Sequence, residues 1–246
     1  MRENAETHKL AQSVADFYEE FGAAFSSTRH APWGVMKLVK DAVKPGDVLV
    51  DFGAGNGRLG LEISSDVKFI AVEPSFSLRE EAKRILTDRP NTEIFAGGFG
   101  VQAPRAAPVL STSADVIACL AVLHHIPTKT AQRAAIQELA ELLKPGGALV
   151  LTVWNLRHRV FFRNKTWLAA WLRWPLVKGG EPGDVWIPWK AQGANAQRFI
   201  HAFTLHELRS LFDPKIWDIK ICQGWGDESQ VRILDAKNLV VLARRK

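Results

Sequence analysis

The sequence has few of the features that cross-link, export or embed a chain. Only two of its 246 residues are cysteines, Cys119 and Cys222, and both lie in apolar, strand-like runs without C-x-x-C spacing. Neither a disulfide framework nor a zinc or other metal site is indicated, and a reduced, cytoplasmic compartment is expected. The polar N-terminus lacks the pattern of a signal peptide, and no apolar run is long enough for a transmembrane segment.

Acidic residues are absent from one long segment, residues 156–178. The segment carries six cations, which equals the formal net charge of +6 for the whole chain, so the other residues are close to neutral together. A local positive field attracts a polyanion, either nucleic acid or an anionic membrane, although a run of charge is also typical of a solvated face. The six cations are Arg157, Arg159, Arg163, Lys165, Arg173 and Lys178.

The middle of the chain alternates short apolar runs with amphipathic stretches of helical period. This alternation predicts an α/β domain with a doubly wound, mostly parallel sheet and helices on both faces. The expected strands are residues 48–52, 69–72, 92–96, 115–122, 148–154, 216–221 and 239–243. The expected helices are residues 8–27, 33–43, 58–65, 77–86, 130–143 and 204–212.

One domain accounts for the whole chain, because the alternation is interrupted once and then resumes. We expect N-terminal helices in residues 1–44, a cofactor-binding core in 45–154, an aromatic and basic insertion after the fifth strand in 155–203, and a closing helix and strands in 204–246. Within the insertion, Trp167, Trp171 and Trp174 share one helical stripe. Such a stripe either packs in a core or offers stacking faces to RNA bases.

A glycine-rich turn follows the first expected strand. The strand ends at Asp51-Phe52 and continues as Gly53-Ala54-Gly55-Asn56-Gly57, where glycines let the backbone approach a ligand closely. The next strand ends near Glu73, whose two carboxylate oxygens suit the two hydroxyls of a ribose. The G-x-G-x-G spacing differs from the G-x-G-x-x-G of dinucleotide folds, so an NAD site is the weaker interpretation.

Together with Lys144-Pro145-Gly146-Gly147, these motifs resemble the class I S-adenosylmethionine-dependent methyltransferases over residues 45–154. The resemblance implies a Rossmann-like, seven-stranded sheet that binds S-adenosyl-L-methionine at its carboxyl edge. The chain departs from the family in having no acid just after the third strand, so backbone groups and Phe99 would hold the adenine. The implied cofactor residues are Asp51, Gly53, Gly55, Asn56, Gly57, Glu73, Phe99 and Leu120.

Three further segments carry a narrower resemblance. They are FSSTRHAPW at residues 25–33, AVLHHI at 121–126, and GDVWIPWK at 183–190 followed by RFIHAF at 198–203. Together they are similar to the tRNA methyltransferases that esterify 5-carboxymethyluridine at the wobble position. The chain departs from that pattern at Ile187, which replaces a valine, and at Phe199-Ile200, which replace two tyrosines.

The narrower resemblance implies roles for residues on the substrate side. A carboxylate is already ionised at pH 7, so methyl transfer to it needs orientation and desolvation rather than a strong base. Arg29 is the first candidate to grip the carboxylate of the substrate or of the cofactor, because a guanidinium fork holds a carboxylate in a fixed plane. Asp184 and His124 complete the expected catalytic set. Trp189, Lys190, Arg157, Arg159, Arg163 and Lys165 are the expected RNA contacts.

The resemblance also implies partners, and the sequence leaves other functions open. tRNA is the expected substrate, and a small zinc-binding activator protein is expected to pair with an edge strand at Thr92–Ala96. One alternative is a methyltransferase for a small lipophilic acid or quinone-like compound, with the basic segment resting on a membrane. Another is a non-catalytic module that binds RNA or protein and keeps the fold.

Overall fold

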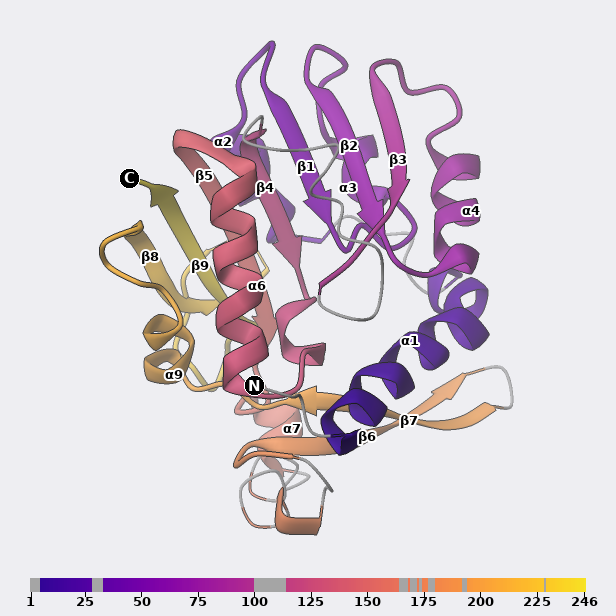
Figure 1. Ribbon diagram of the computed structural model, residues 1–246, viewed down its shortest axis with the longest axis vertical. Coiled ribbons are helices and arrows are strands. Elements are labelled where there is room, and N and C mark those ends of the chain that lie inside the picture. Colours follow the sequence, from indigo (N-terminus) through magenta and orange to yellow (C-terminus); the bar gives the residue numbers. More distant parts are fainter. Residues whose placement is uncertain are drawn as a thin grey trace.

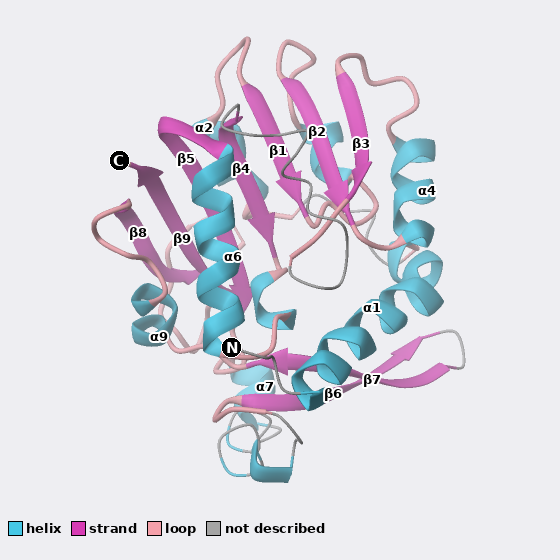
Figure 2. Cartoon of the chain, viewed as in Figure 1, coloured by secondary structure: helices cyan, strands magenta, loops and turns pink. Residues whose placement is uncertain are grey.

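A seven-stranded sheet forms the centre of the molecule, with helices on both of its faces and a separate hairpin at one end (Figures 1 and 2). The order of its strands is β3-β2-β1-β4-β5-β9-β8. The computed structural model describes residues 5–27, 33–99, 114–163, 168, 172, 174–176, 180–191, 194–227 and 229–246.

The first five strands of the sheet are parallel, and the last two are antiparallel to their neighbours. This confirms the expected doubly wound, mostly parallel, seven-stranded α/β fold. Because β1 lies between β2 and β4, the strand order reverses there, and such a switch point opens a crevice at the carboxyl ends. The strands are β1 (Val48–Phe52), β2 (Lys68–Glu73), β3 (Thr92–Ala96), β4 (Ala114–Leu120), β5 (Leu143–Trp154), β8 (Trp217–Trp225) and β9 (Asn238–Arg245).

The helices follow the expected positions, with differences at their ends. The expected second helix begins at Met36 rather than at residue 33, because the preceding residues form a turn against a neighbouring loop. A side chain at Gly34 would lie 1.1 Å from the carbonyl oxygen of Asp227. The helices are α1 (Ala5–Ser26), α2 (Met36–Ala42), α3 (Arg58–Glu62), α4 (Phe76–Ile85), α6 (Lys129–Leu142), α7 (Arg159–Arg163) and α9 (Leu205–Ser210), with 3-10 turns η2 (Leu123–His125) and η3 (Trp174–Leu176). None of these described helices is both long and apolar enough to cross a bilayer.

Each face of the sheet has its own apolar core. On one face, Ile136 and Leu139 of α6 and Leu208 of α9 pack against the sheet. On the other face, Met36 and Val39 of α2 do the same. The strands between the helices are buried on both sides, as parallel strands require.

The insertion after β5 contains an antiparallel hairpin that the sequence did not predict. Its strands are β6 (Asp184–Ala191) and β7 (Ala194–His201). Their side chains alternate between two small cores: Ile187 and Ile200 pack with Leu156, and Phe199 packs with Val14 of α1. Pro188 within β6 hides this alternation, because proline argues against a strand when the sequence is considered alone.

Helix α1 lies across the carboxyl ends of the central strands, beside the hairpin (Figure 1). On one side it is tied to the start of α4, where the Glu19 carboxylate accepts hydrogen bonds from the Phe76 amide at 2.8 Å and the Ser75 hydroxyl at 3.0 Å. On the other side, Phe17 and Phe21 pack against the Trp189 ring of β6. The helix therefore covers the end of the sheet where a ligand is expected.

A buried, charged network closes the base of the hairpin. Asp184 and His201 face each other across the two strands, and His201 Nδ1 donates a hydrogen bond to Asp184 Oδ1 at 2.6 Å. His201 Nε2 lies 3.2 Å from Glu207 Oε1 of α9. Although burial alone lowers the pKa of His201, the two carboxylates raise it to about 9. His201 is therefore protonated at neutral pH and joins the hairpin to α9.

We expect this network to make the stability of the fold depend on pH. The folded-state pKa of His201, about 9, exceeds its ordinary value of 6.5. Its contribution is thus complete below the ordinary value and is lost as the pH rises through 9. The loss is on the order of 3 kcal/mol. Thermal unfolding followed by circular dichroism should therefore show a falling Tm from about pH 7 to about pH 10, and His201→Gln should flatten that fall.

The matched control is His206→Gln, because His206 is exposed on the same helix, α9. It should keep the pH dependence of the wild type. If wild type and His201→Gln lose Tm in parallel over this range, the network does not stabilise the hairpin.

Candidate active site

A cavity of about 540 Å³ opens at the carboxyl edge of the sheet. It lies where the strand order reverses between β1 and β4, as expected for a ligand site in this class of sheet. One set of lining residues comes from the end of β1, the turn and the start of α3 that follow it, the ends of β2 and β4, and the residues after β3: Asp51, Gly53, Ala54, Gly55, Asn56, Arg58, Glu73, Phe99 and Leu120. A second set comes from α1, η2, the end of β5 and α7: Val14, Tyr18, His125, Ile126, Trp154 and Phe161.

The glycine turn leaves room for a ligand. Gly53 has a φ of +80°, and a Cβ there would lie 2.3 Å from Val122 Cγ2. Gly55 has a φ of +57°, and a Cβ there would meet no atom within 4 Å. Because Gly55 lines the cavity, that open space belongs to the ligand site. Gly57 differs from our expectation: it is not among the lining residues, and a Cβ there would press on Leu86 at 2.7 Å, so it allows close helix packing instead.

Glu73 is held at the end of β2 by backbone donors. Its Oε2 accepts the Gly55 N–H at 2.8 Å, and its Oε1 accepts the Ser75 N–H at 3.0 Å. Burial raises the pKa of Glu73 to about 7, although these two hydrogen bonds and the charge of Arg79 lower it. Each carboxylate oxygen has a second lone pair, so Glu73 can still accept two hydrogen bonds from a ligand.

Asp51 and Arg58 bring opposite charges to the same wall. Burial and the charge of Glu73 raise the pKa of Asp51 to about 7, while Arg58 acts in the opposite direction. The Arg58 guanidinium also lies over the Trp33 ring, 5.5 Å from its centroid. This wall therefore presents a carboxyl group and a guanidinium cation side by side, a pattern that suits a zwitterionic amino-acid group.

The remaining predicted cofactor residues line the cavity from other elements. Phe99 and Leu120 follow β3 and end β4, and Phe99 stacks on Phe52 with ring centroids 4.3 Å apart. Asn56 also lines the cavity, and its side-chain amide donates to the Ser26 hydroxyl at 3.0 Å. The amide of Asn56 thus ties the glycine turn to the end of α1.

A chain of hydrogen bonds runs along the second wall. His125 Nδ1 lies 2.9 Å from the Phe199 carbonyl oxygen, which only accepts, so Nδ1 carries the proton. His125 Nε2 must then accept from the Tyr18 hydroxyl at 2.9 Å. The Tyr18 oxygen in turn accepts from Arg198 Nη1 at 3.1 Å. Burial and the positive charge of Arg198 lower the pKa of His125 to about 3.

The structure corrects the expectation for the two adjacent histidines. His125 lines the cavity, whereas His124 is fully buried and does not. The His124 ring is packed against His125 and Trp154, with centroids 4.2 Å and 5.5 Å away. Burial and the neighbouring positive charges lower its pKa well below the usual value. A sequence of two histidines on a single 3-10 turn does not show which ring faces the cavity.

Asp184 and Trp189 also lie elsewhere than expected. Asp184 is buried at the base of the hairpin, away from the cavity lining, and both of its oxygens accept hydrogen bonds, from His201 and from the Glu181 backbone. Trp189 is likewise absent from the lining, because its ring packs against Phe17 and Phe21. In the described residues, both therefore support the position of the hairpin and α1.

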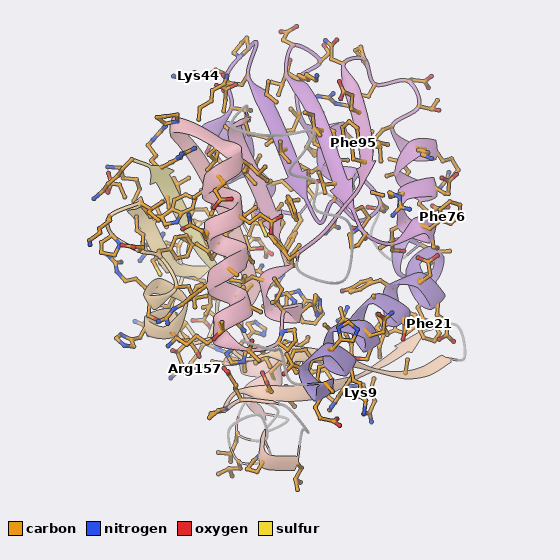
Figure 3. All side chains as sticks on the ribbon, viewed as in Figure 1. Lys9, Phe21, Lys44, Phe76, Phe95 and Arg157 are labelled. Carbon is orange, nitrogen blue, oxygen red and sulfur yellow. The ribbon has the colours of Figure 1, made fainter. Side chains whose placement is uncertain are left out.

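Several predicted substrate residues lie partly or wholly outside the described residues. Arg29 and Lys165 are outside them, as are Trp167 and Trp171, and of Arg163, Lys190 and Trp174 only the backbone is described. Arg159 forms an ion pair with Asp235 at 2.6 Å. Arg157 lies near α7 and the hairpin, at the same end of the molecule as α1 and far from Lys44 at the opposite end (Figure 3).

Four residues that line this cavity or lie directly behind it were not predicted from the sequence. Tyr18 is the chain's only tyrosine, but helical spacing marked it as an apolar face residue. Arg58 directly follows the glycine turn, and Trp154 ends β5. Arg198 begins the RFIHAF segment at residues 198–203, but the resemblance of that segment implied no role for it. Among the described residues, no group of His, Cys, Asp or Glu is arranged to hold a metal ion.

Known proteins match this chain in sequence and in fold. Residues 8–214 match the family model described as a methyltransferase domain. The protein named tRNA (carboxymethyluridine(34)-5-O)-methyltransferase ALKBH8 from Mus musculus is 31% identical over 172 residues, 70% of this chain and 24% of that relative. This chain thus spans about a quarter of the length of the curated relatives it matches first.

Solved structures show the same fold at low identity. A Burkholderia thailandensis 1,6-didemethyltoxoflavin-N1-methyltransferase, with bound 1,6-didemethyltoxoflavin and S-adenosylhomocysteine, matches with a TM-score of 0.65 and 17% identity, over 100% of this chain and 93% of that one. A chain in the complex of the Haloferax volcanii Trm112 methyltransferase activator and a putative methyltransferase matches with a TM-score of 0.61 and 15% identity, over 94% of this chain and 97% of that one. With the family match covering most of its length, this chain belongs to the methyltransferase domain family and has the fold of the class I S-adenosylmethionine-dependent methyltransferases.

Proposed function

We propose that this protein transfers a methyl group from S-adenosylmethionine to the carboxylate of a 5-carboxymethyluridine-type nucleoside at the wobble position of tRNA. We call the second set of lining residues the substrate wall and the first set the cofactor wall. The observation that carries the proposal is His125 on the substrate wall, which is neutral and has both ring nitrogens hydrogen-bonded. The name of the mouse relative, a tRNA (carboxymethyluridine(34)-5-O)-methyltransferase, supports the same substrate.

The first set of lining residues fits the cofactor. Glu73 would accept hydrogen bonds from both ribose hydroxyls, and the open space at Gly55 would receive the ligand beside the backbone. Asp51 and Arg58 would bind the amino and carboxylate groups of the methionine part. When bound, the cofactor supplies an electrophilic methyl group on a positively charged sulfur.

The second set of lining residues suits a nucleophile that arrives already ionised. His125 donates through one ring nitrogen and accepts through the other, and its pKa is about 3, so it cannot serve as a base near neutral pH. Glu73 and Asp51 have pKa values of about 7, but they belong to the cofactor wall, where backbone N–H groups and Arg58 engage them. A hydroxyl, or an amine that is protonated at neutral pH, would need a base here, whereas a carboxylate needs only orientation.

A run of positive charge that follows β5 in the sequence supports an RNA substrate. The cation-rich segment 156–178 follows β5, the strand that contributes Trp154 to the cavity. Phosphate groups would be attracted to this segment without regard to base sequence. The role proposed for Arg29, to grip the substrate or cofactor carboxylate, remains a prediction for a residue outside the described ranges.

We also propose that a small zinc-binding activator protein pairs with β3. The strand stands at the margin of the sheet next to β2, and its side chains at 92–95 are partly exposed (Figure 1). Among the described residues no strand pairs with its outer edge, and such an edge is a template for a strand from a partner. The match to a chain of a complex that contains the Trm112 methyltransferase activator supports this partner.

Glu73→Gln should weaken binding of S-adenosylhomocysteine. The change keeps the shape of the side chain but removes the charge that would strengthen its hydrogen bonds to the ribose hydroxyls, a loss of about 1–3 kcal/mol. Isothermal titration should report a Kd raised about 5- to 150-fold. The matched control is Glu80→Gln, because Glu80 is exposed on α4 and pairs with Lys83. Equal affinity for wild type and Glu73→Gln would remove Glu73 from the cofactor site.

The proposed reaction is tested directly on RNA. Purified protein, alone and co-expressed with a zinc-binding activator, is incubated with labelled S-adenosylmethionine and tRNA that carries 5-carboxymethyluridine. Nucleoside mass spectrometry should show a uridine derivative one methyl group heavier, and mild alkali should release the label because the product is an ester. An alkali-resistant methyl group, or methylation of small lipophilic acids but not of tRNA, would contradict the proposal and favour another methyl acceptor.

A further inference from the structure

A buried cation lies directly behind the substrate wall of the cavity. Arg198 of β7 is only 3% exposed. Its guanidinium carbon lies 4.5 Å from the centroid of the Trp154 ring, and its Nη1 donates to the Tyr18 hydroxyl. Trp154 and Tyr18 line the cavity, but Arg198 itself does not. The positive charge is thus separated from the cavity by one layer of side chains.

The hydrogen-bond chain fixes the hydroxyl that stands between the cation and the cavity. Arg198 has no acceptor atom, so it donates to Tyr18, and the Tyr18 hydroxyl then donates to His125. The Phe199 carbonyl holds the other end of the chain. Phe199 directly follows Arg198 in β7, so one short stretch of the hairpin sets both ends of the chain.

The positive charge of Arg198 acts at the wall. Burial is the largest cause that lowers the pKa of His125 and His124, and the charge of Arg198 lowers the pKa of both further. A field that disfavours a second cation at this place favours an anion by the same electrostatics. Burial strengthens the effect, because water screens a charge poorly when it is enclosed by aromatic rings.

We propose that Arg198, through its buried positive charge one layer behind Tyr18 and Trp154, is a positioning residue that selects a substrate carboxylate over its uncharged forms. The inference rests on the proposed function and concerns the same site. Methyl transfer forms a carboxylate O–C bond and breaks the C–S bond, whose electron pair stays on sulfur, and no proton is transferred. The ester product is neutral, so the charge of Arg198 attracts the reactant and not the product.

The test compares two RNA ligands of nearly equal shape. One is an anticodon stem-loop with 5-carboxymethyluridine, and the other carries the corresponding amide, 5-carbamoylmethyluridine. Kd is measured by fluorescence anisotropy with saturating S-adenosylhomocysteine. Wild type should bind the acid roughly 10-fold more tightly than the amide. Arg198→Met should reduce this ratio to about 1, whereas Arg198→Lys, which keeps the charge, should restore part of it.

The matched control is Arg133→Met, because Arg133 is exposed on α6. It should keep the wild-type ratio, even if general attraction to RNA falls slightly. If Arg198→Met does not fold, Arg198→Gln makes the same test, since it also removes the charge but keeps an N–H donor for the Tyr18 hydroxyl. A folded Arg198→Met or Arg198→Gln protein with an unchanged ratio would overturn the inference.

The ¹³C resonance of the single tyrosine gives a second measurement, which would not distinguish the two ligands if Arg198 had a purely structural role. Protein labelled with ¹³C at tyrosine Cζ should give one resonance, because Tyr18 is the chain's only tyrosine. The acid stem-loop should shift this resonance more than the amide, and Arg198→Met should abolish the difference. Equal shifts for the two ligands in wild type would count against the inference.

The two proposals fail in different ways. Suppose that the protein methylates the carboxylate, but Arg198→Met leaves the ratio of acid to amide affinity unchanged. This result would overturn the role of Arg198 and leave the proposed function intact. Suppose instead that binding selects the acid and depends on Arg198, but no methyl group is transferred in the presence of the activator. This result would overturn the proposed function and support the anion site.

Discussion

The architecture of the site depends on one buried cation, Arg198, and on the rings around it. Its guanidinium contacts Trp154 at the end of β5, the Phe17 ring of α1 at 5.4 Å, and the Tyr18 hydroxyl. A cation removed from water needs such partners, because desolvation is costly unless hydrogen bonds and aromatic faces compensate for it. Satisfying Arg198 therefore brings the covering helix, the hairpin and the sheet together over one cavity.

The two walls of that cavity differ in electrostatic character. The cofactor wall holds two buried acids, Asp51 and Glu73, and burial raises the pKa of both. The substrate wall holds the neutral His125 with Arg198 behind it. A positively charged methyl donor suits the acidic wall, and an anionic acceptor suits the wall backed by the cation, so this separation of charge favours the proposed reaction over one that must first remove a proton.

Two hairpin residues that the motifs indicated as functional make structural contacts instead. Asp184 occupies a motif position, yet its two oxygens are used by His201 and by the Glu181 backbone. Trp189 meets the rings of α1 rather than the cavity. Both keep the hairpin and α1 in place. Substitution of either would therefore affect the site indirectly, by shifting Arg198 and Tyr18.

The sequence alone determined the sheet and most of the proposed cofactor end of the site, because both depend on local patterns. The strand boundaries of β1 and β3, the glycine turn and Glu73 all follow from short-range alternation and from residues adjacent in the chain. Only the tertiary structure decided the substrate end. Tyr18, His125 and Arg198 lie up to 180 positions apart in the chain, and they meet only when α1 and the hairpin pack over the sheet. Whether His124 or His125 faces the cavity depends on the rotation of one 3-10 turn within that packing, which no local pattern specifies.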